Sequence, residues 1–174
     1  QGPWGRSLLS LAVQAEVPQV WDADALNLLA HGAVELPARC LITPHPGEAA
    51  RLLGCTTAEV QADRPRAVRE LARRFRCSAL LKGAGTLIAD AEGRMALCDR
   101  GHPAMASAGL GDVLAGVAGA LLAQGLEPFE AGCLAAWLHA VAGERCADGG
   151  RGLAAGDLIP QVRHLLEEHA PCTK

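Results

Sequence analysis

Short apolar runs alternate with helix-like segments through the first hundred residues, and this alternation restricts the fold more than any other feature of the sequence. The runs VPQVW, CLIT, SALL, TLIA and RMALC are bounded by polar, proline-rich or glycine-rich turns, which is typical of short buried strands. Segments with helical spacing, such as RAVRELARRF, lie between most of them. Such alternation predicts a mostly parallel sheet with helices on both faces, that is, an α/β fold.

The chain changes character after Asp99. DVLAGVAGALLAQG and PFEAGCLAAWLHAVAGERC are rich in alanine, leucine and glycine and indicate two helices with little polar surface. DLIPQVRHLLEEH has the spacing of a last, amphipathic helix. Because no linker, repeat or low-complexity tract interrupts the pattern, we expect a single domain over residues 1–174.

Composition excludes several classes of protein. Half of the 174 residues are hydrophobic, which is enough for a substantial core. The net charge of −3 gives no electrostatic reason to expect binding to nucleic acid or to an anionic membrane. No targeting segment is visible, and the longest uncharged apolar stretch is too short to span a bilayer.

The seven cysteines are odd in number and widely scattered, without a CxxC pair or a Cys/His spacing that suits zinc. We therefore expect neither a disulfide framework nor a zinc site. The thiols are predicted to be small core side chains of a cytoplasmic protein: Cys40, Cys55, Cys77, Cys98, Cys133, Cys146 and Cys172.

Four loops carry residues suited to chemistry, and in α/β sheets ligands collect where strands lead into helices. In WDADALN, Asp22 and Asp24 follow a predicted strand, and Asn27 comes one turn later. Asp24 suits a helix cap. Alternatively, the three side chains form a polar wall beside phosphates or a cation, and the spacing leaves both interpretations open.

In the second loop, TPHPGE, two prolines stiffen the backbone around His45, and Gly47 allows a sharp entry into the next helix. A lone histidine is often structural, but one that is fixed in this way is also suited to binding. Glu48 stands at the start of that helix, where a negative charge is favoured.

The third loop, LLKGAGT, has two interpretations. Its glycines suit a tight hairpin. Lys82, bare backbone N–H groups and Thr86 would also form a phosphate cradle, although the Walker pattern is absent.

The fourth loop is AMASAGLGD, which leads into the first apolar helix. Gly109 and Gly111 let backbone N–H groups converge at the helix N-terminus, which favours an anion. Asp112 in the same place either caps the helix or faces a substrate hydroxyl while the glycines hold a phosphoryl group.

Taken together and in this order, WDADALNLLA, LITPHPGEAARLLG, LLKGAGT and AMASAGLGDVLAGVAGALLAQG resemble the ADP- or ATP-dependent NAD(P)H-hydrate dehydratases of the ribokinase-like superfamily. The resemblance covers most of residues 21–143. It implies a ribokinase-like three-layer sandwich. The domain of that family begins further upstream and has a GPGLG-type turn where this chain has GPWG, so we expect the N-terminal part of the fold to be missing here.

The resemblance also implies roles for single residues. Asp112 would act as the base at the substrate hydroxyl, and His45 would contact the hydrated dinucleotide, with Asp24 and Asn27 beside it. Glu48 would organise Mg²⁺ and its waters, because TPHPGE stands where related vitamin kinases have TPNxxE. Gly111 and the KGAGT segment match positions that contact the adenine nucleotide, and Gly109 lies in the same turn as Gly111. The nucleotide-binding set is therefore Lys82, Gly83, Ala84, Gly85, Thr86, Gly109 and Gly111.

The implied reaction is dehydration of (6S)-NADHX or NADPHX to NADH or NADPH, driven by phosphoryl transfer from ADP or ATP. Two alternatives stay open: a kinase of a small vitamin-precursor alcohol, and a non-catalytic fragment that binds adenine nucleotides. HPGE and DADALN favour the dehydratase. A fused or separate NAD(P)HX epimerase and a homo-oligomeric state are the further expectations.

Overall fold

The apolar runs form one open five-stranded sheet in the order β1–β2–β3–β4–β5. The computed structural model describes residues 2–32, 34–150 and 152–171. Strands β1, β2 and β3 run parallel, and β4 and β5 continue the sheet as antiparallel neighbours. The strands are β1 (Gln19–Trp21), β2 (Cys40–Ile42), β3 (Ser78–Leu81), β4 (Thr86–Ala89) and β5 (Met95–Cys98).

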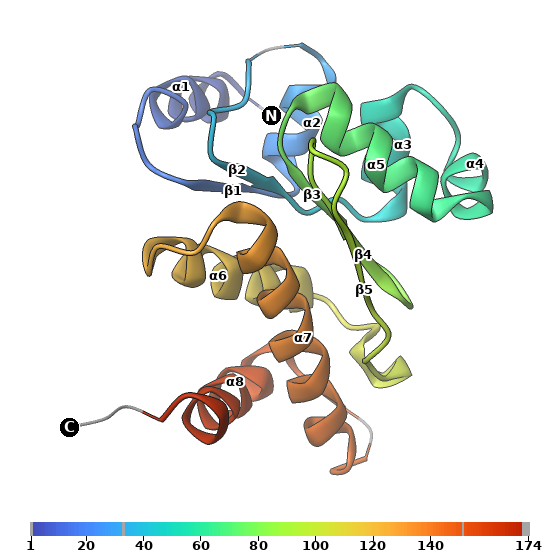
Figure 1. The fold of residues 1–174 in the computed structure, drawn as a ribbon, viewed down its shortest axis with the longest axis vertical. Coiled ribbons are helices and arrows are strands. Elements are labelled where there is room, and N and C mark those ends of the chain that lie inside the picture. The colour runs from blue at the N-terminus through green and yellow to red at the C-terminus, as the bar shows by residue number, and fades with distance from the viewer. Residues whose placement is uncertain (1, 33, 151, 172–174) are drawn as a thin grey trace.

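Helices cover both faces of this sheet, as the alternating pattern predicts, so the molecule has three layers (Figure 1). One face carries the helices that lie between the strands in sequence: α2 (Asp24–Ala30), α3 (Pro46–Leu53), α4 (Thr57–Ala62) and α5 (Arg64–Phe75). The other face carries α6 (Leu110–Ala123), α7 (Pro128–Ala147) and α8 (Ala155–His169). The chain opens with α1 (Pro3–Ala12), and a 3₁₀ turn, η1 (Pro103–Met105), precedes α6.

The inner strands supply both hydrophobic cores by simple alternation. In β2, Cys40 and Ile42 are buried against the α2–α5 face, while Leu41 is buried against the α6–α8 face. In β3, Leu80 is buried against the α6–α8 face and Leu81 against the α2–α5 face. Successive side chains of a strand point to opposite faces, so strands that are apolar throughout require cover on both sides.

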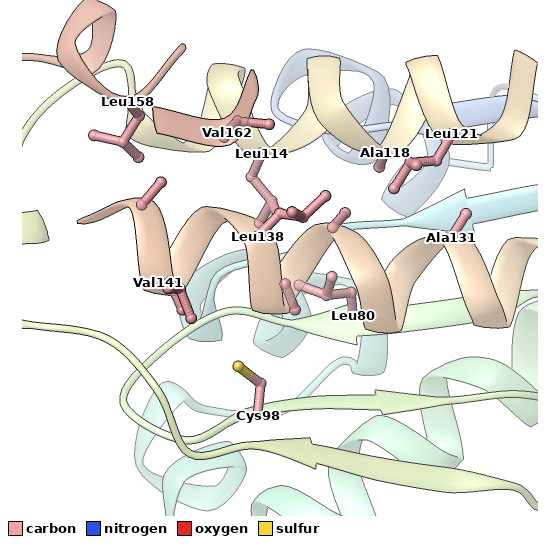
Figure 2. Packing of buried hydrophobic residues seen from close by; sticks show 14 of the residues in the cluster. Leu80, Cys98, Leu114, Ala118, Leu121, Ala131, Leu138, Val141, Leu158 and Val162 are labelled. Atoms are coloured by element: carbon pink, nitrogen blue, oxygen red, sulfur yellow. The ribbon is translucent and has the colours of Figure 1, made fainter. Parts of the chain in front are cut away.

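Helix α7 is the central element of the core that lies between the sheet and helices α6–α8. It contacts β2, β3, β4 and β5 on one side and both α6 and α8 on the other. Figure 2 shows Leu114, Ala118 and Leu121 of α6 on one side of α7 and Leu80 and Cys98 of the sheet on the other. This position between layers explains why α7 has so little polar surface.

The structure differs from the sequence-based expectations in three helices, α4, α6 and α8, and α8 begins at Ala155, two residues before its expected start at Asp157. Helix α4 was not predicted, because Val60 is its only buried residue and no apolar periodicity marks it. The signal that does mark it is a capping box, in which Thr56 accepts from Glu59 N and Glu59 accepts from Thr56 N. Helix α6 begins at Leu110, two residues before its expected start at Asp112.

The remaining expectations concern cysteines and membranes. Six cysteines are free thiols, and Cys172 lies outside the described residues. Cys55, Cys133 and Cys146 are partly exposed rather than buried in the core. Among residues 2–32, 34–150 and 152–171, no helix is long and apolar enough to cross a membrane.

Candidate functional site

The carboxyl ends of β1, β2 and β3 lie side by side and carry three of the four predicted loops. Backbone bonds continue the sheet just beyond the strands: Thr43 N donates to Trp21 O at 3.0 Å, and Lys82 N donates to Pro44 O at 2.9 Å. Asp22, His45 and Lys82 therefore leave the sheet at neighbouring points. This is the edge at which α/β sheets bind ligands.

The Lys82 ammonium group lies between two carboxylates at this edge. Its Nζ is 2.8 Å from Asp22 Oδ1 and 3.9 Å from Glu48 Oε2. The three side chains are 20%, 13% and 7% exposed for Lys82, Asp22 and Glu48, so the charges are mostly removed from water. A charge in such a place is stable only when it is paired, so each member depends on the others.

His45 and Glu48 build the start of α3 around this cluster. His45 Nδ1 accepts from Gly47 N at 3.0 Å and from Glu48 N at 3.2 Å, and Glu48 Oε2 accepts from His45 N at 2.8 Å. His45 is thus the N-cap of α3. Its Nε2 is 3.5 Å from Glu48 Oε1, and its side chain is half exposed. Both ring nitrogens therefore have partners at the start of α3, and only the half-exposed surface of the ring is accessible to a ligand.

The GLGD turn places free backbone donors beside an exposed carboxylate. Gly109 is the N-cap of α6 with φ +82°, a left-handed conformation that glycine adopts readily. The first intrahelical bond runs from Val113 N to Gly109 O, so the N–H groups of Leu110, Gly111 and Asp112 are free of helix bonds. Asp112 is the third residue of α6 and is exposed. Within the described residues no bond engages its carboxylate and Gly109 holds the cap position, so Asp112 does not cap the helix.

The strand-end cluster and the GLGD turn meet at Gly111. A Cβ atom on Gly111 would lie 3.4 Å from Lys82 Nζ and 3.7 Å from Asp22 Oδ2. The fold thus brings together three of the predicted residues, Lys82, Glu48 and Gly111. It adds Asp22, which the sequence interpretation grouped only with the polar wall. Its distinguishing signal was its position as the first residue after β1.

The KGAGT segment is the hairpin between antiparallel β3 and β4. Arg64, the first residue of α5, holds it from behind by donating to Leu81 O at 3.3 Å and to Gly85 O at 3.1 Å. Burial lowers the pKa of the Arg64 guanidinium. Thr86 Oγ1 donates to Gly83 O at 3.0 Å and closes the turn. Arg64 was missed at the sequence level because nothing local marks it, since it acts on a turn about 20 residues later.

Asp24 and Asn27 are not part of the cluster. Asp24 is the first residue of α2, it is exposed, and it makes no capping bond, so the capping interpretation is wrong here as well. Asn27 accepts from Arg51 through its Oδ1 atom. The residue between the two aspartates, Ala23, has φ +48° and ψ −115°. This conformation turns Asp22 toward Lys82 while Asp24 faces solvent.

The site has limited capacity for a metal ion of its own. In the part of the chain that the structure describes, no three His, Cys, Asp or Glu side chains cluster in a way that could hold a metal. Magnesium in phosphoryl-transfer sites commonly keeps several waters and is held by substrate phosphates with one or two carboxylates. Glu48 and Asp22 fit that smaller role.

Comparison with known proteins identifies the family of this chain. A family model described as NAD(P)H-hydrate dehydratase matches residues 1–162. The chain belongs to the NAD(P)H-hydrate dehydratase family. Among curated relatives of this family, the bifunctional NAD(P)H-hydrate repair enzyme of Vibrio cholerae is 50% identical over 153 residues, which are 87% of this chain and 31% of that protein. The ADP-dependent (S)-NAD(P)H-hydrate dehydratase of Neisseria meningitidis is 45% identical over 163 residues, 89% of this chain and 55% of that protein.

Solved structures share the fold. The ADP/ATP-dependent NAD(P)H-hydrate dehydratase of Bacillus subtilis, co-crystallised with ATP and Mg²⁺, is 27% identical with a TM-score of 0.81 and covers 92% of this chain and 58% of that one. A ribokinase-like superfamily protein of Enterococcus faecalis is 22% identical with a TM-score of 0.86, over 99% of this chain and 61% of that one, and shows the ribokinase-like fold. The chain thus spans only part of each relative's length.

Proposed function

We propose that this chain carries the catalytic half of an NAD(P)H-hydrate dehydratase that uses ADP, or ATP, to restore hydrated NADH and NADPH. The observation that carries the proposal is the GLGD turn. An exposed Asp112 carboxylate, which no bond from the described residues engages, follows free backbone N–H groups directly, and the Lys82 ammonium lies beside the same turn. The names of the Neisseria and Bacillus relatives support the same activity and the adenine nucleotide.

The chemistry follows from the poor leaving ability of hydroxide. The hydrated nicotinamide ring bears a hydroxyl group, and transfer of the terminal phosphoryl group of ADP to that oxygen forms a phosphate ester and releases AMP. The carbon–oxygen bond then breaks with departure of inorganic phosphate, and the adjacent carbon loses a proton as the ring double bond forms. The net change is loss of water from the ring and hydrolysis of one phosphoanhydride.

Asp112 is proposed to accept the hydroxyl proton. An ionised carboxylate is too weak a base to remove a proton from an alcohol in advance. In the loose transition states typical of phosphoryl transfer, however, the proton can leave late, as the phosphoryl group arrives. The carboxylate then mainly orients the hydroxyl oxygen. The absence of other bonds to this carboxylate among the described residues suits this task.

The remaining residues are proposed to bind and to neutralise charge. The N–H groups after Gly109, including that of Gly111, and the Lys82 ammonium would face the transferring phosphoryl group. The hairpin Lys82–Gly83–Ala84–Gly85–Thr86 would hold the rest of the nucleotide. His45 would contact the dinucleotide, and Asp24 and Asn27 would lie at the outer rim. Mg²⁺ would arrive with the phosphates and meet Glu48, where it would offset phosphate charge.

The deciding experiment supplies hydrated NADH to the full-length protein with ADP, with ATP or without nucleotide. We expect the absorbance of NADH to return only with nucleotide, together with stoichiometric AMP or ADP and phosphate. A kinase of a small alcohol would instead accumulate a phosphorylated alcohol. A non-catalytic fragment would bind nucleotide without releasing phosphate. A homo-oligomer, an associated epimerase and a cytoplasmic location belong to the same proposal.

A further inference from the structure

The segment of residues 100–110 leads from β5 to the GLGD turn, and α7 holds it at three points. These points lie at the start, the middle and the end of the segment. Each involves a different α7 residue: Glu144, Gly143 and His139. None of the three belongs to the candidate site described above.

At the start of the segment, Glu144 accepts from the backbone and from a side chain. Gly101 N donates to its Oε1 at 2.7 Å, and Arg100 Nε donates to Oε1 at 3.0 Å and to Oε2 at 3.1 Å. Arg100 Nη2 also pairs with Oε2. These interactions, with Arg100 as the largest cause, lower the pKa of Glu144 to about 2. Because the Arg100 guanidinium bonds both oxygens of the Glu144 carboxylate, the pairing fixes the relative orientation of the two groups as well as their separation.

In the middle, Met105 packs directly against Gly143. A Cβ atom at this position would lie 2.6 Å from Met105 Cε and 2.7 Å from Cγ, and it would also overlap Sδ. These distances are shorter than any ordinary contact, so residue 143 must lack a side chain for Met105 to occupy this place. Between Met105 and Gly109, residues 106–108 are exposed. The Met105 contact is therefore the last apolar attachment before the turn.

At the end of the segment, the ring of His139 lies under the first turn of α6. Its Nε2 is 2.9 Å from Leu110 O. A carbonyl oxygen only accepts, so the ring carries its proton on Nε2 and donates it. Burial, with a smaller effect from nearby Lys82, lowers the pKa of His139, which keeps the ring neutral. Leu110 immediately precedes Gly111 and Asp112, so this bond acts on the residues that would meet the substrate.

We infer that His139, Gly143 and Glu144 are positioning residues that set the placement of Gly111 and Asp112 from α7. Helix α7 is packed between the sheet and two helices, so it is a rigid reference for a turn that otherwise follows an exposed loop. Supporting shells of this kind matter because a displacement of about 1 Å at a reacting group costs on the order of 100-fold in rate. The inference rests on the proposed function for its kinetic consequence, and on geometry alone for its effect on the turn.

The first test replaces His139, the donor to Leu110 O, in two ways: once by a residue that cannot donate a hydrogen bond and once by a residue that can. His139→Leu removes the N–H group, whereas the amide of His139→Gln can reach the position of Nε2. In the full-length protein we expect His139→Leu to lower kcat roughly 10- to 100-fold and to leave KM for ADP within about threefold. His139→Gln is expected to retain kcat within about threefold, because its N–H group can hold Leu110 O.

The second test concerns the middle attachment. Gly143→Ala forces Met105 out of its place, and we expect a loss in kcat of roughly tenfold. The matched control is Gly116→Ala on α6, where an added Cβ would meet nothing within 4 Å. That variant is expected to keep the wild-type rate. Thermal unfolding of every variant corrects each rate for the folded fraction.

Amide hydrogen exchange at Val113, whose N–H group donates to Gly109 O, gives a readout that does not need activity. His139→Leu and Gly143→Ala are expected to raise the exchange rate of this amide at least about tenfold, while His139→Gln and Gly116→Ala are not. Wild-type exchange and wild-type kcat in His139→Leu would overturn the inference. So would equal losses in His139→Leu and His139→Gln. If the wild-type protein lacks dehydratase activity, the proposed function fails, and the exchange measurement still decides whether α7 positions the turn.

Discussion

The two halves of the site are built in opposite ways. At the strand ends, Asp22, Glu48 and Lys82 are mostly buried and satisfy one another, and His45 is tied into a helix cap. At the start of α6, Asp112 is exposed and free of bonds within the described residues. The first region pairs its charges before any ligand arrives, and the second leaves its carboxylate free. This difference suggests that the strand ends support binding, whereas the helix start supports chemistry.

The largest expected effect tests the chemical side of this comparison. Asp112→Asn keeps the size of the side chain and removes its ability to accept a proton. We expect turnover of hydrated NADH to fall by roughly 100-fold or more, the usual scale for loss of a general base. ADP affinity by calorimetry and the melting temperature should stay near wild type, because the part of the chain that the structure describes makes no bond to this carboxylate. Glu167→Gln on α8, also an exposed carboxylate, is the control, and near-normal turnover in Asp112→Asn would remove this residue from the base role.

The next effect tests the supporting side. Lys82→Met leaves two mostly buried carboxylates without their cation, and we expect a loss of about 2 kcal/mol in the free energy of unfolding. Nucleotide affinity should fall as well. By contrast, Arg73→Met removes the exposed Arg73–Glu70 pair and should cost less than about 0.5 kcal/mol.

The double variant Lys82→Met/Asp22→Asn distinguishes unpaired charge from lost packing. Removing the second charge should recover at least half of the lost stability in urea denaturation. If Lys82→Met were as stable as the wild type, the strand-end cluster would not be a paired unit, and the contrast between the two regions would disappear.

A smaller effect concerns the backbone that separates Asp22 from Asp24. Ala23 has φ +48° and ψ −115°, a conformation in which an alanine side chain is strained. Ala23→Gly should therefore raise the free energy of unfolding by about 1 kcal/mol. Ala25→Gly, one residue into the regular part of α2, should lower it by roughly the same amount. Equal destabilisation by both changes would show that residue 23 carries no strain.

Much of this architecture could be predicted from local patterns. Every strand was expected, because each is a short apolar run closed by turn residues, and burial on both faces leaves few other uses for CLIT or SALL. The GLGD glycines were predicted as site residues because they open a helix N-terminus, and Glu48 was predicted from the family resemblance. Lys82 was predicted because it directly follows an apolar strand. The carboxyl ends of parallel strands meet at one edge, so polar residues that follow such strands come together.

The parts that could not be predicted depend on contacts between distant residues. Asp22 differs from Asp24 in sequence by its place directly after β1, but the Ala23 conformation and the position of Lys82 decide that Asp22 joins the cluster. Arg64 donates to Gly85 O, 21 residues later in the sequence, and His139 donates to Leu110 O, 29 residues earlier. Neither has a spacing rule, because packing of whole elements creates both contacts. The α4 helix was missed for another reason, since its capping box, and not its apolar spacing, marks it.

The smallest effect concerns the pH dependence of the α7 attachment at Glu144, which holds the segment that leads to the start of α6. Arg100 and Gly101 favour the ionised form of Glu144 and lower its pKa from the ordinary value of 4.5 to about 2. A carboxyl group with a depressed pKa contributes stability that is complete above 4.5 and is lost as the pH falls toward about 2. Glu144→Gln should therefore be less stable than the wild type at pH 7, and the two should converge in urea denaturation near the lower pH. A difference that persists unchanged in acid would mean that shape rather than charge at residue 144 holds Arg100, and the attachment would then be steric throughout.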